Sequence, residues 1–253
     1  MNRWIRCQIP RPEHEIRLIC FPNAGAGANA FATWGRALPA RIEVCAVELP
    51  GRWTRIREPL YTRFDDLSGP LRDALEPLCR GRFAFLGYSM GGLLAFELTR
   101  QLCESGAQIP EHLFVVSTPA PGARPTKRVS HLDTTQMMNA VARNTGRAFP
   151  AELGSEMTDL LVPILRADLA VAESYRCENL RPLPVPISAF AGTGDPAFED
   201  PVALSGWRSQ TMAAFSAREY RGDHFVLDQH RDDVMRHISE ALGASPIQSR
   251  TAP

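Results

Sequence analysis

Residues 82–102, RFAFLGYSMGGLLAFELTRQL, join a strand pattern, a glycine-rich turn and a helical pattern without a break. The spacing Gly87-x-Ser89-x-Gly91 places one hydroxyl at the bend, between glycines that let the two arms of the turn pass closely. A strand, G-x-S-x-G and a helix in this order are typical of a nucleophile elbow. The sequence therefore predicts Ser89 as a nucleophile. It also predicts the N–H group of Met90, at the start of the helix, as an oxyanion donor.

Short apolar runs alternate with helical patterns along most of the chain. Strands are predicted at 16–21, 42–49, 82–87, 112–117, 185–192 and 216–222, and helices at 31–38, 64–78, 90–106 and 230–242. This alternation is typical of an α/β fold, in which a mostly parallel sheet carries helices on both faces. A chain of 253 residues fits one such domain, over residues 1–253.

One long segment breaks the alternation. From about residue 125 to residue 175 the chain shows only helical patterns, such as TTQMMNAVARN and SEMTDLLVPILRADLAVAESY. A connection of this length is too long for an ordinary crossover, so we expect a helical insertion over 125–180 that caps one end of the sheet. The last residues, 243–253, are expected to form a disordered tail.

A serine hydroxyl needs a base before it can act as a nucleophile at neutral pH. His224, in YRGDHFVL, directly follows the last predicted strand, and this fold places nucleophile, acid and histidine in that order along the chain. The acid should follow an intervening strand. Asp195 comes directly after the run VPISAFAG and its glycines, and Asp200 is the alternative. The acid would hold the tautomer of the histidine and stabilise its protonated form.

The loop after the first strand, FPNAGAGANAF (21–31), allows two interpretations. Its small residues could present the N–H groups of Ala24 and Gly25 to a ligand, which would supply a second oxyanion donor. Alternatively, GAGANA (25–30) fits the dinucleotide pattern G-x-G-x-x-A, with Glu48 to bind a ribose. Pro22 and Asn23 lie between the strand and the first glycine, and this alternative leaves the serine, aspartate and histidine unexplained. We therefore favour the oxyanion interpretation.

Composition argues against several function classes. The formal net charge is zero, which leaves no basic footprint for nucleic acid. No apolar run approaches the ~18 residues of a membrane span, and the N-terminus lacks the apolar stretch of a signal peptide. The six cysteines are scattered, without a CxxC pair or metal-ligand spacing. We therefore expect a reduced, cytoplasmic protein with no metal, cofactor, nucleic-acid or membrane partner.

Six segments together resemble the type II thioesterases that accompany polyketide synthases and nonribosomal peptide synthetases. In order along the chain they are LICFPNAGAGANAFATW, VELPGRWTRIREP, FLGYSMGGLLAFEL, PILRADLAVAESY, AFAGTGDP and YRGDHFVL. The resemblance covers about residues 16–242 and implies an α/β-hydrolase fold with a helical lid. It implies a monomer that edits by hydrolysing acyl thioesters on the phosphopantetheine arm of acyl or peptidyl carrier proteins.

The resemblance also assigns the site residues. It implies a catalytic triad of Ser89, Asp195 and His224, and backbone oxyanion donors at Met90 and Ala24. The family often has histidine at the positions of Tyr88 and Asn23, so these two residues are expected to tune acyl-chain preference or lid contacts.

The insertion adds further expectations. Most of its apolar side chains should form its core and some should line an acyl channel, among them Met137, Met138, Leu160, Leu161 and Leu165. Arg166 is expected to form a salt bridge within the insertion. Two other function classes stay open: another serine hydrolase, such as a carboxylesterase or a product-releasing thioesterase, and a non-catalytic module that binds carrier proteins.

Overall fold

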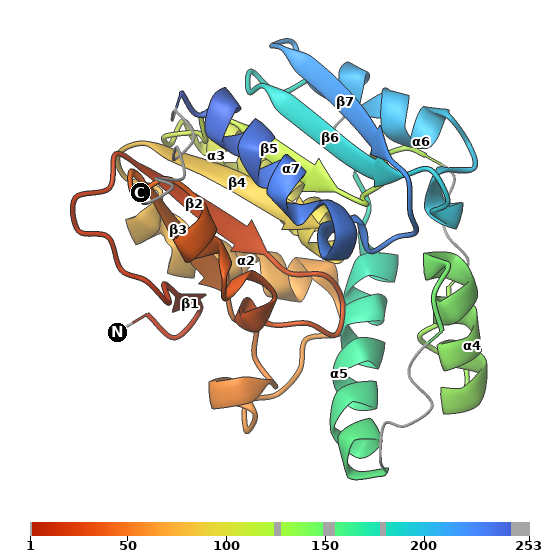
Figure 1. Ribbon diagram of the computed structural model, residues 1–253. Helices are drawn as coiled ribbons and strands as arrows, with labels where there is room; N and C mark the ends of the chain where they lie inside the picture. Colours follow the sequence, from red (N-terminus) through yellow and green to blue (C-terminus); the bar gives the residue numbers. More distant parts are fainter. Residues whose placement is uncertain (1, 124–127, 149–154, 178–180, 244–253) are drawn as a thin grey trace, which may run out of the picture.

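The computed structural model describes residues 2–123, 128–148, 155–177 and 181–243. Within them one seven-stranded sheet has the order β1-β3-β2-β4-β5-β6-β7 (Figure 1). Its strands are β1 Ile5–Arg6, β2 Ile16–Phe21, β3 Ile42–Val47, β4 Phe83–Tyr88, β5 Leu113–Val116, β6 Ile187–Gly192 and β7 Phe215–Tyr220. Only β1, which pairs with β3, is antiparallel to its neighbour among the described strands. The predicted mostly parallel sheet is confirmed.

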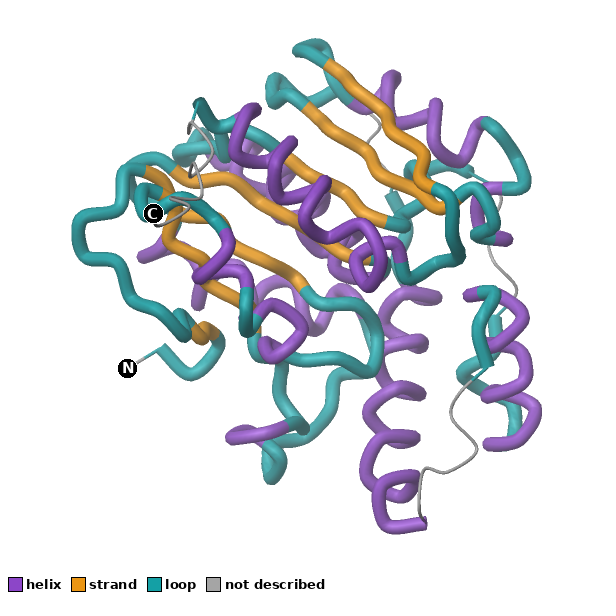
Figure 2. The backbone as a smooth tube through the Cα atoms, in the orientation of Figure 1, coloured by secondary structure: helices purple, strands orange, loops and turns teal. Residues whose placement is uncertain are grey.

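Helices cover both faces of this sheet (Figure 2). They are α1 Trp34–Ala37, α2 Phe64–Leu75, α3 Met90–Ser105, α4 Thr134–Thr145, α5 Ser155–Ser174, α6 Val202–Ser205 and α7 Val226–Ala241. Helices α2 and α3 pack on one face, and α1 and α7 pack on the other, because two separate apolar clusters divide the strand residues between these helix pairs.

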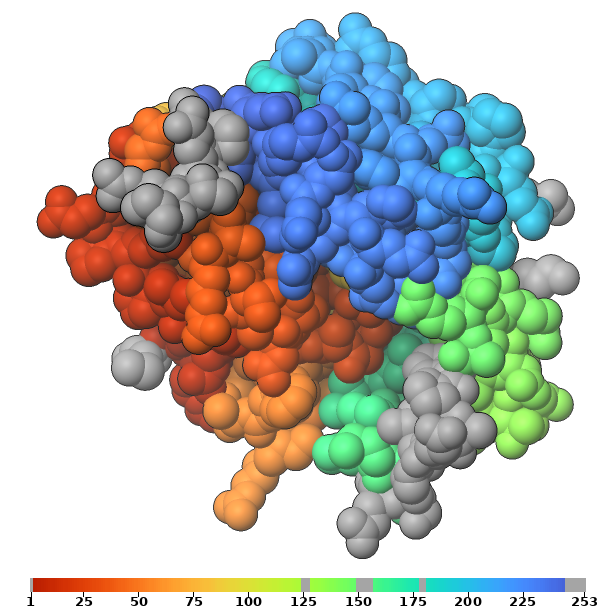
Figure 3. Space-filling view, in the orientation of Figure 1, coloured from red at the N-terminus to blue at the C-terminus, as the bar shows by residue number. Residues whose placement is uncertain are grey.

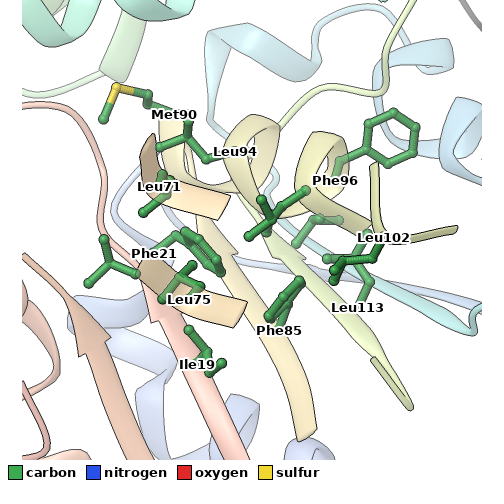
Figure 4. Close-up of a cluster of buried hydrophobic side chains, with 14 of the residues drawn as sticks. Ile19, Phe21, Leu71, Leu75, Phe85, Met90, Leu94, Phe96, Leu102 and Leu113 are labelled. Atoms are coloured by element: carbon green, nitrogen blue, oxygen red, sulfur yellow. The ribbon is translucent and has the colours of Figure 1, made fainter. Parts of the chain in front are cut away.

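The core follows the two-residue period of the strands. Ile19 and Phe21 belong to the cluster with α2 and α3, whereas Leu18 and Cys20 belong to the cluster with α7. Figure 4 shows Phe21 and Phe85 between the leucines of α2 and α3, with their rings edge to face at 5.2 Å. Because both faces are buried, these strands read as nearly continuous apolar runs in the sequence.

The segment between β5 and β6 contains α4 and α5. Figure 1 shows both helices beyond the end of the sheet toward which the parallel strands point. A small apolar cluster that includes Met137, Val141 and Leu165 joins the two helices. In Figure 3 the residues of α4 touch those that follow β7, and the His224 amide donates to the Thr145 carbonyl oxygen there. Residues 124–127, 149–154 and 178–180 of the insertion, and all but Gly243 of the predicted tail, lie outside the described residues.

Three local elements differ from the sequence-based expectations. The last helix, α7, begins at Val226, four residues before the predicted start at residue 230. The helix expected at 31–38 is replaced by a 3-10 turn, Ala28–Phe31, and the four-residue α1. Gly35 inside this stretch and Pro39 after it both weaken a helix. The antiparallel β1 was not predicted, because a two-residue strand carries no periodic pattern.

A disulfide joins Cys7 and Cys45, so the expectation that the cysteines are all reduced is wrong for this pair. The antiparallel register that pairs Arg6 with Ala46 places the next residue, Cys7, opposite Cys45. The two cysteines are 38 residues apart in the sequence, a distance over which local spacing carries no signal. Cys20 and Cys79 remain thiols, and burial raises the pKa of both, so they serve as small apolar residues.

Candidate active site

Ser89 occupies the bend between β4 and α3, as predicted. Its φ of 53° and ψ of −116° lie in a region that residues other than glycine rarely adopt. A Cβ on Gly87 would lie 2.4 Å from the carbonyl oxygen of Gly91, and a Cβ on Gly91 would lie 2.1 Å from that of Phe21. Gly87 is therefore needed for β4 and α3 to approach this closely, and Gly91 for α3 to approach the end of β2.

Three side chains from distant parts of the chain form one hydrogen-bonded row. The Nε2 atom of His224 lies 2.9 Å from Oγ of Ser89, and its Nδ1 atom lies 2.7 Å from Oδ2 of Asp195. Asp195 is 3% exposed and His224 is 9% exposed, so water has little access to the hydrogen bond between them. A serine, an imidazole and a buried carboxylate at these distances can generate a nucleophile at neutral pH.

The structure brings Asp195, and not Asp200, to the histidine. Asp195 directly follows the turn after β6, where its Oδ1 also accepts the N–H of Ala197 at 3.0 Å. Asp200 lies further along and its Oδ1 accepts the N–H of Val202, so it shapes the turn before α6.

The backbone of His224 is held from three sides. Its N–H donates to the carbonyl of Thr145 at the end of α4. Its carbonyl accepts from the hydroxyls of Ser117, at 2.7 Å, and Tyr88, at 3.2 Å. Tyr88 is therefore a buried support for the histidine loop, and Asn23 lines the cavity beside Ser89.

Met90 and Ala24, the two residues expected to supply oxyanion donors, both line the smaller cavity beside Ser89. Met90 is the first residue of α3, so its N–H has no partner inside the helix. No hydrogen bond within the described part of the chain occupies the N–H of Ala24. The N–H of Gly25 instead donates to Asp168 Oδ2 at 2.8 Å, so only Ala24 of the two expected candidates is available to a ligand.

A buried ion pair that no local sequence pattern indicates fixes this loop. Both carboxylate oxygens of Asp168, on α5, accept from Arg52 at 2.7 Å, and each of these side chains is 4% exposed. Arg52 also donates to the carbonyl of Ala26 at 2.6 Å. The segments PGR and LRAD that contain the pair were visible in the sequence, but nothing local indicated that they meet. Arg166 donates to the carbonyls of Ser130 and Leu132, and no salt bridge to it occurs among the described residues, contrary to expectation.

Glu48 does not have the environment of a ribose-binding residue. Its Oε2 accepts the N–H of Ala28 at 3.0 Å, so the carboxylate holds the glycine-rich loop itself. The side chain is buried, and this burial raises the pKa of its carboxyl group. The structure therefore gives the dinucleotide interpretation no support.

Two cavities meet at Ser89 and His224. The larger cavity has a volume of about 290 Å³ and lies between residues 23–26 and α5. The smaller cavity has a volume of about 180 Å³ and extends from Met90 to Glu173. Of the five apolar residues expected in the insertion core or channel, three line the larger cavity: Met138, Leu161 and Leu165. Met137 is fully buried in the apolar cluster of the insertion, and Leu160 is 45% exposed.

The sheet, the strained turn and the hydrogen-bonded row define an α/β-hydrolase. A family model described as "Thioesterase domain" matches residues 16–242, so the chain belongs to the thioesterase family. Within that class the enzyme is a thioester hydrolase. Each helix in the described ranges is too short or too polar to span a lipid bilayer.

Known proteins resemble the chain over nearly its full length. The gramicidin S biosynthesis protein GrsT of Aneurinibacillus migulanus is 35% identical over 243 residues, which cover 96% of this chain and 94% of that protein. Thioesterase PikA5 of Streptomyces venezuelae is 33% identical and covers 99% of this chain and 88% of its own. The solved structure of BorB, a type II thioesterase from the borrelidin biosynthetic cluster, matches with a TM-score of 0.84 at 31% identity, over 96% of this chain and 97% of that one.

Proposed function

We propose that this thioesterase removes acyl groups from the phosphopantetheine arm of acyl or peptidyl carrier proteins, as an editing type II enzyme of polyketide or nonribosomal peptide synthesis. The observation that carries the proposal is the row of Ser89, His224 and Asp195, which opens onto an apolar cavity. The relatives named for gramicidin S biosynthesis and for the borrelidin cluster support this class of substrate.

Acylation begins with the serine hydroxyl. Oγ of Ser89 attacks the thioester carbonyl while Nε2 of His224 takes its proton, and Asp195 stabilises the imidazolium at Nδ1. The tetrahedral oxyanion accepts hydrogen bonds from the N–H groups of Met90 and Ala24. Collapse of this intermediate breaks the C–S bond, and the imidazolium returns the proton to the departing pantetheine thiolate.

Deacylation repeats these steps with water as the nucleophile. His224 takes a proton from a water molecule that attacks the acyl-serine, and the same two N–H groups receive the second oxyanion. When the C–O bond to the serine breaks, the imidazolium protonates Oγ of Ser89 and the free carboxylic acid is released. The apolar side chains Met138, Leu161 and Leu165 would hold the acyl chain in the larger cavity.

The helical insertion would act as the lid of this site. Helices α4 and α5 close the larger cavity from the side away from the sheet, and together with the Ser89 bend they exclude water from the acyl chain. We further propose that the enzyme is a monomer in the cytoplasm, as the resemblance to type II thioesterases implies. Light scattering on the purified protein tests the oligomeric state.

The test of this function compares substrates with one acyl chain. The enzyme should hydrolyse an acyl group on a carrier protein clearly faster than the oxygen ester of the same acid, and Ser89→Ala should abolish turnover while carrier binding persists. Equal or faster hydrolysis of the oxygen ester would favour a carboxylesterase. Full retention of turnover in Ser89→Ala would refute the assigned nucleophile.

A further inference from the structure

We propose that an arginine-lined pocket beside the C-terminal end of α5 binds the phosphodiester of the carrier-bound pantetheine arm. This inference rests on the proposed function and deepens it, because it assigns a binding site to the part of the substrate that the two cavities at Ser89 leave unplaced. The pocket has a volume of about 430 Å³. Its charged and polar lining includes Arg63, Arg128, Ser130, His131, Glu173 and Arg176.

The charge of the pocket favours an anion. Three guanidinium groups face one carboxylate, that of Glu173. This carboxylate already accepts the N–H groups of Val129, at 2.6 Å, and Ser130, at 3.1 Å, together with the Ser130 hydroxyl at 2.6 Å. Its negative charge is therefore largely satisfied within the protein. Guanidinium groups offer paired donors whose spacing matches the oxygens of a phosphate.

The arginines are placed so that a ligand can engage them. Arg63 pairs with Asp65 at 3.2 Å, but both side chains are more than 60% exposed, and a pair this exposed is worth only about 0.2–1 kcal/mol. Arg176 donates through Nη1 to the carbonyls of Glu173 and Tyr175, which holds it at the end of α5. Arg128 also lines the pocket and is exposed.

The pocket adjoins the catalytic centre through α5. Leu169 lines both cavities at Ser89, and Glu173, one helical turn later, lines both the smaller cavity and the arginine pocket. The larger cavity, the smaller cavity and the pocket therefore follow one another along this helix. The substrate has the same order of parts: an acyl chain, a thioester at Ser89, a pantetheine arm and a terminal phosphodiester.

The experiment uses two small substrates that carry the same acyl group, acyl-pantetheine and acyl-phosphopantetheine. The wild-type enzyme should show a higher kcat/KM for the phosphorylated substrate, and added salt should reduce this preference because it screens exposed charges. In the double variant Arg128→Ala/Arg176→Ala, kcat/KM should fall about fivefold for each arginine, so roughly 25-fold in all. This loss is expected both on acyl-phosphopantetheine and on the acylated carrier protein. Hydrolysis of acyl-pantetheine should not change.

Matched variants separate the pocket from general charge effects. Arg72→Ala removes an exposed arginine at the other end of α2 and should keep the full preference. Arg128→Lys/Arg176→Lys keeps the positive charges and should therefore keep part of the preference for acyl-phosphopantetheine. Equal wild-type kcat/KM for the two substrates, or a preference that survives in the double alanine variant, would overturn the proposal.

Binding distinguishes failure of this inference from failure of the proposed function. Calorimetric titration of phosphopantetheine does not require turnover, and the wild type should bind it more tightly than the double alanine variant. If no acyl thioester is hydrolysed but this difference persists, the proposed function fails and the anion site stands. If hydrolysis is normal and the difference is absent, only the anion site fails.

Discussion

At the scale of single residues, each member of the row of Ser89, His224 and Asp195 is held by a different constraint. Ser89 is held by a strained backbone that two glycines permit, and Asp195 by a turn whose Ala197 N–H binds its carboxylate. His224 is held through its main chain by Ser117, Tyr88 and Thr145. Because these supports do not depend on one another, one side chain can be changed while the geometry of the others persists.

Asp195→Asn tests the role of the carboxylate directly. An amide group facing Nδ1 would favour the tautomer with its proton on Nε2, which cannot accept the proton of Ser89. We expect kcat to fall by about 10⁴-fold, the loss that this change causes in a serine protease triad, with little change in melting temperature. Steady-state kinetics and thermal unfolding provide the two measurements.

Asp200→Asn is the matched control for this substitution. Asp200 uses one side-chain oxygen to accept the N–H of Val202, and asparagine offers an equivalent oxygen. Its kcat should stay within about twofold of the wild type. A comparable loss in both variants, or none in Asp195→Asn, would contradict the assignment of the acid.

At the scale of elements, α5 connects the insertion to the loop after β2. Asp168 on this helix accepts the N–H of Gly25 and both ends of the Arg52 guanidinium, and Arg52 binds the carbonyl of Ala26. The position of the Ala24 N–H therefore depends on where α5 packs. A change in this ion pair should affect both stability and catalysis.

Asp168→Asn is expected to have both effects. An amide cannot accept all the hydrogen bonds that the carboxylate accepts, and it leaves the buried Arg52 charge without a counter-ion, a change that typically costs about 3–5 kcal/mol of folding stability. A displaced Ala24 N–H should lower kcat by about 10²-fold in the protein that remains folded. Denaturant unfolding and kinetics below the melting temperature measure the two effects separately.

An exposed ion pair provides the comparison. Glu111 binds Arg82, with side chains that are 41% and 51% exposed, and pairs of this kind contribute at most about 1 kcal/mol. Glu111→Gln should therefore leave kcat unchanged and stability nearly so. If the two variants lost equal stability, burial of the Asp168 pair would not explain the effect.

At the scale of the whole molecule, a half-buried histidine couples stability to acidity. His112 precedes β5, its Nε2 lies 2.9 Å from Ser188 Oγ, and its ring stacks on Phe114 at 4.2 Å. Burial lowers its pKa to about 4, whereas an unfolded chain protonates histidine near pH 6.5. As the pH falls from 6.5 to 4, the unfolded chain takes up the proton and the folded chain does not, so stability falls.

His112→Phe should reduce this pH dependence. The full shift corresponds to roughly 3 kcal/mol lost between pH 6.5 and 4, and phenylalanine keeps the stacked ring without a titrating group. Unfolding free energies measured by denaturant titration should therefore decline less steeply with falling pH in the variant. Groups that titrate elsewhere are common to both proteins, so identical slopes would show that His112 does not contribute.

Much of the fold could be predicted because its signals are local. Strands buried on both faces are continuous apolar runs, and the close approach at Ser89 requires glycines on both sides of it within five residues. The positions of Asp195 and His224 followed from where each strand ends, since the carboxyl ends of parallel strands meet at one edge. The order of these residues along the chain was therefore enough to predict that they lie together.

The amino-acid sequence by itself determined the α/β architecture and the three side chains that meet at the end of the sheet. Only the tertiary structure decided which cysteines pair, that Asp168 rather than Arg166 forms the salt bridge of α5, and that three arginines share a pocket beside it. The physical reason is the range of the interactions. Periodicity and turn chemistry act between neighbours in the chain, whereas a disulfide, a buried ion pair and a charged pocket join segments whose separation in sequence carries no signal of their contact.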